Sequence, residues 1–386
     1  MRVTHITSGI SAKLGGTATA VTELSRAQRS AGLDVTVISS FMGERDTSAD
    51  VLREAGIDVI EIGPCRPPLQ THPAMKPTLA DHIAAADVLH THGLWEEIQH
   101  RAAALARELH KPYVITPHGM LTPWSLEQKP LKKKIYMMLR LRQDLDRAAA
   151  IHFTSAAERD ASARLRLKAK ILVEPLGLNL NDFDPLPEKE TFRREYPTIG
   201  DRKVIVFLGR VHPGKGVEYL IPALRHMQTG NAVLVAVGPD SHGYMATMKQ
   251  LAQASGVADR VLFTGLLRGR QKLEALVDAD IFALPSEHEN FGMAVLEALA
   301  CRTPVVVSDG VAIHGEVADA GVGAVIPFAD RNITRLAAEL DRWLTDPHLR
   351  ASAAAKARDF VAQRFAWDGI ARRWVQHYAA MIGNSK

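Results

Sequence analysis

Hydrophobic and polar positions along the chain alternate between two patterns. Short runs rich in valine and isoleucine, such as residues 35–40 and 88–93, are separated by longer stretches with apolar positions at helical spacing, such as residues 17–30. The short runs are apolar at nearly every position, which is typical of parallel strands buried on both faces. Strands that alternate with helices in this way predict βαβ units and a doubly wound α/β fold.

This alternation occurs twice along the chain. The first series has strand-like runs at 3–7, 35–40, 59–63, 88–93, 113–119 and 149–155. The second series has runs at 204–209, 232–238, 261–265, 281–286, 304–309 and 323–328. Between them, EPLGLNLNDFDPLPEKE at 174–190 is dense in Pro, Asn, Gly and Asp, as expected for an interdomain linker. We therefore predict two doubly wound domains, residues 1–180 and 181–366.

The last segment, residues 367–386, is predicted to contain an amphipathic helix. Ile370, Trp374, Tyr378 and Met381 recur at helical spacing on one face. An apolar face of this kind needs a partner. We expect the helix to cross back to the N-terminal domain and to pack across both domains.

Composition narrows the class of protein. The 386 residues are 46% hydrophobic and 23% charged, which is typical of a soluble globular chain. Two cysteines form no disulfide framework, nothing like a signal peptide precedes the first strand-like run, and no apolar stretch approaches the ~20 residues needed to cross a bilayer. We therefore expect a cytoplasmic protein that does not span the membrane.

The net charge is only +4, but cations are concentrated in EQKPLKKKIYMMLRLRQDLDR, residues 127–147. A basic amphipathic helix can lie on an anionic membrane surface. A solvated helix against the first domain remains an open alternative. Nucleic-acid binding is not expected, because no aromatic stacking platform accompanies the charge. The predicted membrane contacts are Lys132, Lys133, Lys134, Arg140 and Arg142.

Candidate chemistry is sought at the strand ends, because ligands in doubly wound folds bind beyond the carboxyl ends of the strands. In FLGRVHPGKG, Gly209 ends a predicted strand, and Arg210 and Lys215 follow it ahead of a helix. Both cations lie where a helix N-terminus already favours anions, so a diphosphate is the expected ligand. No Ser or Thr follows the Lys, so a P-loop is not indicated. The alternative is a solvated turn.

The stretch SEHENFGMAVLEALA, residues 286–300, carries two carboxylates. Glu289 lies at a predicted strand-to-helix turn, where Asn290, Phe291 and Gly292 can offer backbone NH groups to an oxygen-rich ligand. Glu297 is the single charge in an apolar run that predicts a buried helix, and a buried carboxylate needs a partner. The alternative is one surface carboxylate and one core carboxylate satisfied by a buried hydroxyl.

Two strand-end features stand out in the first domain. Gly15 and Gly16 precede a helix and allow close backbone approach to a ligand, although a flexible turn has the same sequence. His118 follows a predicted strand and is well placed to meet a ligand, whereas a lone His is usually structural. His90 and His92 have no nearby Cys or carboxylate triad, so we predict no metal site there.

FLGRVHPGKG and PSEHENFGMAVLEALACRTPVVVSD, with the Gly-Gly pair, THGLW and TPHGM, resemble the retaining glycosyltransferases of family four over almost the whole chain. The resemblance implies the GT-B fold, two Rossmann-like domains facing across a cleft, and a nucleotide-diphosphate sugar of UDP or GDP type as donor. It also implies a glycan or lipid-linked acceptor, cell-surface polysaccharide synthesis, and no metal or other cofactor. The motif HPGKG in place of HPKKG, and Asn290 where Gly or Ser is common, are modest departures.

The resemblance also implies roles for the strand-end residues. Arg210 and Lys215 would bind the diphosphate and stabilise it as leaving group, in place of a metal ion. Gly16 would let the first loop approach the phosphates, and His118 would lie beside the donor sugar. With Glu289, which would contact the transferred sugar, His118, Arg210 and Lys215 form the implied catalytic set.

Other implied contacts concern the rest of the donor. Glu297 would accept hydrogen bonds from the ribose, and the NH groups after Asn290 would hold sugar or phosphate oxygens. Gly265 and Leu266 would border the base. The alternatives are a sugar-nucleotide epimerase of the same fold, and a membrane- or nucleic-acid-binding protein that has lost the chemistry. For a lipid-linked acceptor, peripheral attachment to the inner face of the membrane is expected.

Overall fold

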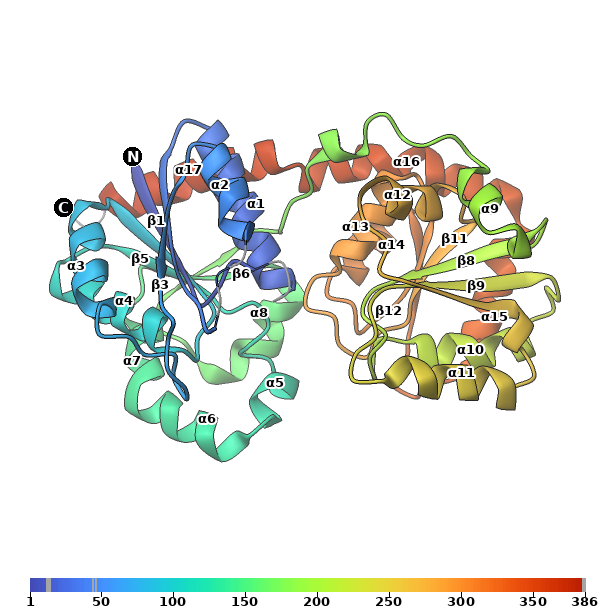
Figure 1. The fold of residues 1–386 in the computed structure, drawn as a ribbon, viewed down its shortest axis with the longest axis horizontal. Helices are drawn as coiled ribbons and strands as arrows, with labels where there is room; N and C mark the ends of the chain where they lie inside the picture. Colours follow the sequence, from blue (N-terminus) through green and yellow to red (C-terminus); the bar gives the residue numbers. More distant parts are fainter. Residues whose placement is uncertain (12–14, 44, 46, 384–386) are drawn as a thin grey trace. The chain divides into compact units, whose positions relative to one another are not determined.

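The chain folds into two compact units in the computed structural model, which describes residues 1–11, 15–43, 45 and 47–383. The first unit comprises Met1–Gly177 and Trp367–Lys386, and the second comprises Leu178–Ala366. The chain therefore passes between the units twice (Figure 1). The first stretch ends at Gly177 rather than at the predicted residue 180.

The first unit is built on a parallel sheet with strand order β3-β2-β1-β4-β5-β6-β7. Its strands are β1 Arg2–Thr7, β2 Asp34–Ser40, β3 Asp58–Ile62, β4 Val88–His92, β5 Tyr113–Thr116, β6 Ala150–Phe153 and β7 Lys170–Val173. The first six match the predicted runs. Strand β7 was not predicted, because it is an edge strand in which only Leu172 is buried, so it lacks a continuous apolar run.

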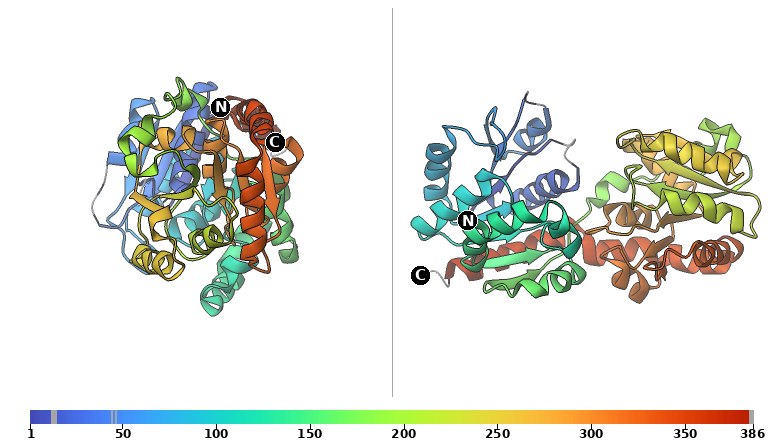
Figure 2. Two further views of the ribbon diagram at one scale, coloured as in Figure 1. Left: turned by 90° about the vertical axis from the view of Figure 1, so that its right-hand side faces the viewer. Right: turned by 90° about the horizontal axis from the view of Figure 1, so that it is seen from below.

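The helices of the first unit flank this sheet (Figure 2). They are α1 Gly16–Ser30, α2 Asp50–Glu54, α3 Met75–Ala85, α4 Glu97–Glu108, α5 Pro123–Glu127, α6 Pro130–Tyr136, the π-helical η3 Met137–Leu141, α7 Arg142–Asp146, α8 Ala156–Ser162 and α17 Trp367–Gly383, with short 3-10 turns η2 Thr47–Ala49 and η4 Ala163–Leu165. No helix in the described part of the chain is both long and apolar enough to cross a bilayer.

The two faces of the first sheet have different chemistry. Alternate strand residues such as Ile6, Leu89 and Ile151 point to one face and form the apolar core with α3 and α4. Their neighbours His5 and His90 point to the other face, because successive side chains of a strand alternate. That second face is covered by α1 and α17, which lie side by side (Figure 1).

The predicted C-terminal helix is present as α17, and it belongs to the first unit. Ile370, Trp374, Tyr378 and Met381, the side chains predicted to share a face, are all buried. At its start, Trp367 packs so closely on Gly177 that a Cβ at Gly177 would lie 2.4 Å from the indole ring. The chain therefore leaves and re-enters the first unit at neighbouring points.

The second unit contains a parallel sheet with strand order β10-β9-β8-β11-β12-β13. Its strands match the predicted runs: β8 Lys203–Leu208, β9 Ala232–Val237, β10 Val261–Gly265, β11 Ile281–Leu284, β12 Val305–Ser308 and β13 Gly323–Ile326. Its helices are α9 Thr191–Glu195, α10 Val217–His226, α11 Tyr244–Ala254, α12 Gly269–Val277, α13 Met293–Ala300, α14 His314–Ala320, α15 Ile333–Thr345 and α16 Pro347–Phe365, with 3-10 turns η5 Leu180–Phe183, η6 Pro197–Ile199 and η7 Ala258–Arg260.

Candidate functional site

The loops that follow β8, β9 and β10 lie against one another at the carboxyl edge of the second sheet. The amide of Gly209 donates to the carbonyl of Val237 at 2.9 Å, and the amide of Gly238 donates to the carbonyl of Gly265 at 2.8 Å. A Cβ at Gly238 would lie only 1.8 Å from the carbonyl oxygen of Gly209, so this approach requires glycine. Two predicted donor-binding glycines, Gly209 and Gly265, are thus brought to one edge.

Two predicted side chains on this edge face solvent. Arg210 is exposed and makes no hydrogen bond or ion pair with any residue that the structure describes. Leu266 is 50% exposed at the end of the edge strand β10. An open guanidinium and an exposed apolar side chain on one sheet edge suit a ligand with both an anionic and a planar apolar part.

The loop between β8 and α10 interlocks with the loop after β11. The carbonyl of Gly214 accepts from the Glu287 amide at 2.9 Å and from Ser286 Oγ at 3.0 Å. Gly216 adopts a φ of 106°, and a Cβ there would lie 2.7 Å from the ring of Pro285. These contacts fix the position of Lys215 relative to the β11 loop.

Lys215 and Glu289, predicted separately, are partners in the structure. Lys215 Nζ lies 2.6 Å from Glu289 Oε2, and about a quarter of each side chain is exposed. The backbone of Glu289 is held by the residues after β12, since its amide donates to the Gly310 carbonyl at 2.9 Å. An ammonium has three donors, so Lys215 can hold Glu289 and still donate to an anionic ligand.

The start of α10 already has an anionic partner in the chain itself. The Glu218 carboxylate accepts from the amides of Gly214 at 2.5 Å and Gly216 at 3.1 Å. These NH groups at the helix N-terminus are therefore occupied. A phosphate bound at this loop would rely on the side-chain cations.

The turn before α13 combines a buried anchor with an open helix end. Phe291 is 3% exposed and packs edge-on against Phe365 at 6.0 Å between ring centroids. Gly292 precedes α13 with a φ of 97°, a conformation that favours glycine. The Phe291 side chain therefore serves packing, and the N-terminus of α13 favours negative charge beside it.

Glu297 has a partner that the sequence did not predict. Its Oε1 lies 3.1 Å from Lys272 Nζ on α12, and 20% of the Glu297 side chain is exposed. The prediction of a helix buried on all sides was wrong, because Met293, Ala294 and Glu297 form a partly exposed stripe on α13. Lys272 precedes the motif in sequence and becomes its neighbour only through the packing of α12 on α13.

The predicted glycine pair of the first unit begins α1. Gly15 and Gly16 are exposed, and a Cβ at either position would meet no atom of the described residues within 4 Å. Gly15 has a φ of 85°, so its conformation, rather than crowding, favours glycine. Among the described residues, none crowds this helix start.

His118 stands on a turn that is fixed by a buried carboxylate. It has a φ of 51°, and the following residue, Gly119, has a φ of 80°. Glu158 accepts from the Gly119 amide at 2.5 Å and from the Thr154 amide at 2.8 Å. Glu158 was not predicted, although Ser155 and Glu158 form an S-x-x-E capping signal, with Ser155 Oγ accepting from the Glu158 amide at 3.0 Å.

The ring of His118 is hydrogen-bonded to a group of buried histidines. Its Nε2 lies 3.1 Å from Nδ1 of His92, and burial lowers the pKa of His118 to about 3, with the nearby His152 adding to the effect. His118 is therefore neutral at pH 7. A neutral imidazole offers a ligand one donor or one acceptor, but no charge.

Three of these histidines have the proximity of a metal site. Nitrogens of His5, His90 and His92 lie within 4.8 Å of one another. Each of their ring nitrogens has a hydrogen-bond partner: His5 bonds Gln28 and His92, His90 bonds Tyr378 and Thr116, and His92 also bonds His118. A metal ion would have to displace these bonds, so the arrangement is better described as a hydrogen-bond network.

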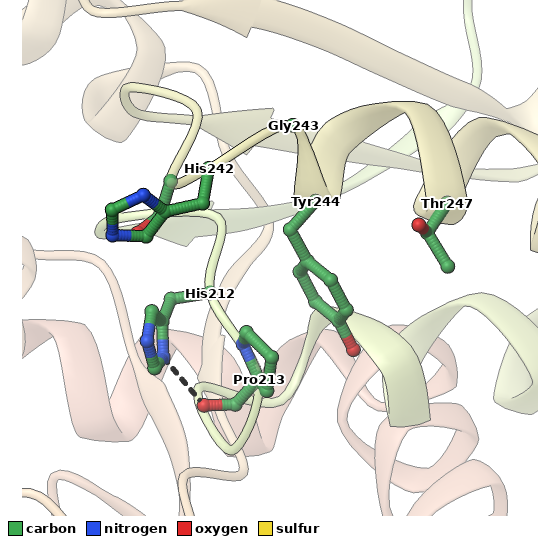
Figure 3. Close-up of a pocket in the computed structure, with 7 residues that line it drawn as sticks. His212, Pro213, His242, Gly243, Tyr244 and Thr247 are labelled. Atoms are coloured by element: carbon green, nitrogen blue, oxygen red, sulfur yellow. Dashed lines mark hydrogen bonds between the residues drawn. The ribbon is translucent and has the colours of Figure 1, made fainter.

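A small open depression lies beside the β8–α10 loop in the second unit (Figure 3). The rings of His212, His242 and Tyr244 border it, and His212 Nδ1 donates to the Pro213 carbonyl at 2.7 Å. None of the predicted site residues lines this depression.

Two family models match the chain, one in each unit. The first, described as glycosyl transferase 4-like domain, matches residues 15–177. The second, described as glycosyl transferases group 1, matches residues 188–360.

Curated relatives carry glycosyltransferase names. An uncharacterized glycosyltransferase of Methanocaldococcus jannaschii is 33% identical over 216 residues, 55% of this chain and 54% of the relative. A D-inositol 3-phosphate glycosyltransferase of Stackebrandtia nassauensis is 34% identical over 211 residues, 52% of this chain and 47% of the relative. The chain thus spans about half the length of these relatives. A GDP-mannose-dependent alpha-(1-6)-phosphatidylinositol monomannoside mannosyltransferase of Mycobacterium tuberculosis is 28% identical over 66% of each chain.

Solved structures share the fold over nearly the whole chain. Anabaena Alr3699/HepE in complex with UDP has a TM-score of 0.82 at 18% identity, covering 98% of this chain and 100% of that chain. Sucrose-phosphate synthase from Thermosynechococcus elongatus has a TM-score of 0.75 at 20% identity, covering 100% of both chains. The matches in both units and the shared two-sheet fold confirm the resemblance seen in the sequence. The chain belongs to the family-four glycosyltransferases, which have the GT-B fold.

Proposed function

We propose that the chain is a retaining glycosyltransferase that moves a sugar from a nucleotide-diphosphate sugar to a glycan or lipid-linked acceptor in cell-surface polysaccharide synthesis. The convergence of Arg210, Lys215 and Glu289 at the carboxyl edge of the second sheet carries the proposal. Complexes of the structural neighbour HepE with UDP and with UDP-glucose support a donor of this class. A relative named for a phosphatidylinositol mannoside substrate supports a lipid-linked acceptor.

In this proposal the two cations stabilise the departing diphosphate. When the bond between the sugar C1 and the phosphate oxygen breaks, its electron pair remains on the diphosphate, and Arg210 and Lys215 meet the added charge. The acceptor oxygen bonds to C1 from the same face, and its proton passes to a diphosphate oxygen. The cations supply the neutralisation that a divalent ion supplies in other transferases, so we propose that no metal is required.

The remaining predicted residues would hold the rest of the donor. Glu289, kept in place by Lys215, would accept from hydroxyls of the transferred sugar, and Leu266 would contact the face of the base. Glu297 would accept from the ribose. A thermal-shift screen of UDP-, GDP- and ADP-sugars tests the donor class, because a ligand that binds only the folded chain raises its melting temperature. No shift with any of the three would argue against the proposal.

The role of Glu297 can be tested with the donor nucleotide alone. Glu297→Gln should weaken UDP binding by roughly ten- to a hundred-fold, because a hydrogen bond to a charged acceptor is worth about 1.5 to 3 kcal/mol. The loss should shrink for 2′-deoxy-UDP, which lacks one of the hydroxyls. Calorimetric titration of both proteins with both nucleotides gives the coupling directly.

Glu188→Gln, at an exposed position in the same unit, is the matched control and should bind both nucleotides as the wild type does. An equal loss for UDP and 2′-deoxy-UDP in Glu297→Gln would assign the carboxylate to its ion pair with Lys272 alone.

The structure changes which cations of the basic segment are available to a membrane. Lys133 turns inward, with Nζ 2.5 Å from the Ser125 carbonyl and 5.1 Å from the centre of the Trp95 ring. Arg140 pairs with Glu97 at 2.6 Å, and Arg142 pairs with Asp146 at 2.7 Å. These three predicted contacts are therefore engaged within the first unit.

The exposed part of the segment still combines charge with apolar surface. Lys132 and Lys134 are exposed beside Leu131, Met138 and Leu139, which are 70%, 72% and 69% exposed. Side chains of this kind can enter an anionic interface, the apolar ones between lipid tails and the lysines among headgroups. We propose that α6 and η3 attach the enzyme peripherally to the inner face of the membrane, near a lipid-linked acceptor.

Replacing Lys132 and Lys134 with Gln should weaken binding to phosphatidylserine-containing vesicles by about 1 kcal/mol per charge. Vesicle co-sedimentation at fixed ionic strength measures this change. Lys168→Gln with Lys170→Gln removes the same charge from another exposed part of the first unit and should bind like the wild type. If both double variants bound the vesicles equally, α6 would be a solvated helix that does not contact the membrane.

A further inference from the structure

A continuous chain of hydrogen-bonded side chains runs across the face of the first sheet that α1 and α17 cover. Successive polar atoms along it are 2.6 to 3.1 Å apart. Apart from the partly exposed His118, its members are almost fully buried, so each must find its partners inside the protein. In order, the chain consists of His118, His92, His5, Gln28, Tyr378, His90, Thr116, His152 and the backbone carbonyl of Glu174.

The carbonyl of Glu174 fixes the proton order, because a carbonyl can only accept. His152 Nε2 must donate to it at 2.7 Å. Burial lowers the pKa of His152 to about 4, so the ring is neutral at pH 7 and its Nδ1 is an acceptor. Thr116 has one hydroxyl proton and gives it to His152 Nδ1 at 2.8 Å. Thr116 Oγ1 must then accept from His90 Nε2 at 2.6 Å.

The proton positions on the residues from the two covering helices follow in the same way. His90 is also neutral, since burial holds its pKa well below 6.5, so its Nδ1 accepts the Tyr378 proton at 2.6 Å. The Tyr378 oxygen then accepts from the Gln28 amide nitrogen at 3.1 Å. The carbonyl oxygen of Gln28 is thereby turned toward His5.

From Gln28 the order continues to the strand-end histidine. His5 Nε2 donates to Gln28 Oε1 at 2.8 Å, which leaves His5 Nδ1 to accept from His92 Nε2 at 2.9 Å. His92 Nδ1 is then an acceptor, so His118 Nε2 must donate to it at 3.1 Å. The Nδ1 atom of His118 is left without a proton, and it bonds no residue in the described part of the chain.

We propose that Gln28 and Tyr378 are positioning residues that hold His118 as the Nε2-protonated tautomer and present its bare Nδ1 as a hydrogen-bond acceptor. The chemistry that such an atom recognises is an O–H donor, a hydroxyl of the bound substrate. This last step rests on the proposed function, whereas the tautomer follows from the network alone.

The network also limits what His118 does in the reaction. A proton taken up at His118 Nδ1 could pass through His92 and His5, but it would stop at Gln28, because an amide oxygen is not a base at neutral pH. The hydrogen-bond network therefore provides no path by which a proton taken up at His118 could reach solvent or another base. His118 acts as a neutral acceptor that orients a hydroxyl, and general-base catalysis falls to another group.

Nitrogen-15 NMR of the full chain, labelled at histidine and without ligand, tests the tautomer directly. The wild type should show one tautomer for His118, with bare Nδ1 and protonated Nε2, and the signals lost in His118→Asn assign it. Tyr378→Phe frees the Gln28 amide to turn its nitrogen toward His5, which reverses the order. The Nδ1 signal of His118 should then move toward the protonated range.

Tyr136→Phe is the matched control, because the Tyr136 hydroxyl lies in the same unit outside the network, and it should leave the His118 signals unchanged. Gln28→Leu removes the acceptor of His5 and should also mix the His118 tautomers, which provides a second test if Tyr378→Phe does not fold. A protonated Nδ1 in the wild type, or unchanged signals in the folded variants, would overturn the proposal. Because no substrate is present, a failure of the proposed function would not affect this result.

Discussion

Arg210→Ala is expected to slow sugar transfer by roughly 10²- to 10³-fold, the loss typical of removing one preorganised donor from a developing negative charge. Arg210 gives the cleaner test of the two cations, since its guanidinium is exposed and makes no ion pair within the described chain. Lys215→Ala would also leave Glu289 without the ammonium that lies 2.6 Å from it, so its effect would mix two causes.

Turnover of the nucleotide sugar and calorimetric affinity for the nucleoside diphosphate, measured on the same protein, separate the effects on reaction and binding. Arg342→Ala is the matched control, because Arg342 is exposed and pairs with Glu339 at the surface of α15, where such pairs contribute little. If Arg210→Ala had wild-type turnover and affinity, the assignment of the diphosphate site to this loop would be wrong.

The first unit is expected to lose stability as pH falls from about 6.5 to about 4. Burial lowers the pKa of His5 and His152 to about 4 and that of His118 to about 3, and it holds the pKa of His90 and His92 well below 6.5. In this window the unfolded chain binds protons that the folded chain does not, so the free energy of unfolding decreases. His5 alone accounts for about 3 kcal/mol once the pH is below its folded pKa.

Denaturant unfolding of the full chain between pH 8 and pH 4.5 measures this slope. His5→Gln should reduce the number of protons taken up on unfolding by about one, while His226→Gln, at an exposed position, is the control and should reduce it less, because its surroundings change less on unfolding. Burial raises the pKa of the Glu96 carboxyl, so that group opposes part of the loss of stability as pH falls. Burial raises the pKa of Glu174, but hydrogen bonds from His377 and Arg373 outweigh this and hold it below its usual range. A flat profile above pH 4.5 would contradict the expectation.

The strands that are buried on both faces could be predicted from the sequence, because a continuous apolar run is the pattern expected of such a strand. Strand β7 escaped because Lys170, Ile171 and Val173 are exposed at the sheet edge. The burial predicted for α13 from its apolar run was too high, because Glu297 lies on a partly exposed face and pairs with Lys272. A charged partner on another helix covers a carboxylate without leaving any trace in the local pattern.

Candidate residues at strand ends were predictable because parallel strands all end at one edge, whereas their pairings depend on strand order. Lys215 and Glu289 come from loops far apart in sequence and meet because β8 and β11 are neighbours in the sheet. The histidine network was not predicted for the same reason. Its members come from four strands, two helices and the segments that follow β5 and β7, and the closing residue, Tyr378, lies 288 positions from its partner His90.

The return of α17 to the first unit has a consequence for the order of events at the ribosome. The strands of the first sheet emerge early, but the helix that covers their histidine face is translated only after the entire second unit. During that interval α1 can already cover His5, but the part of the face that α17 covers, with His90 and His152, is open to water. During this interval the imidazoles can form hydrogen bonds with water, whereas aliphatic side chains could not. A nascent chain with this polar face therefore exposes less aggregation-prone apolar surface until α17 is translated.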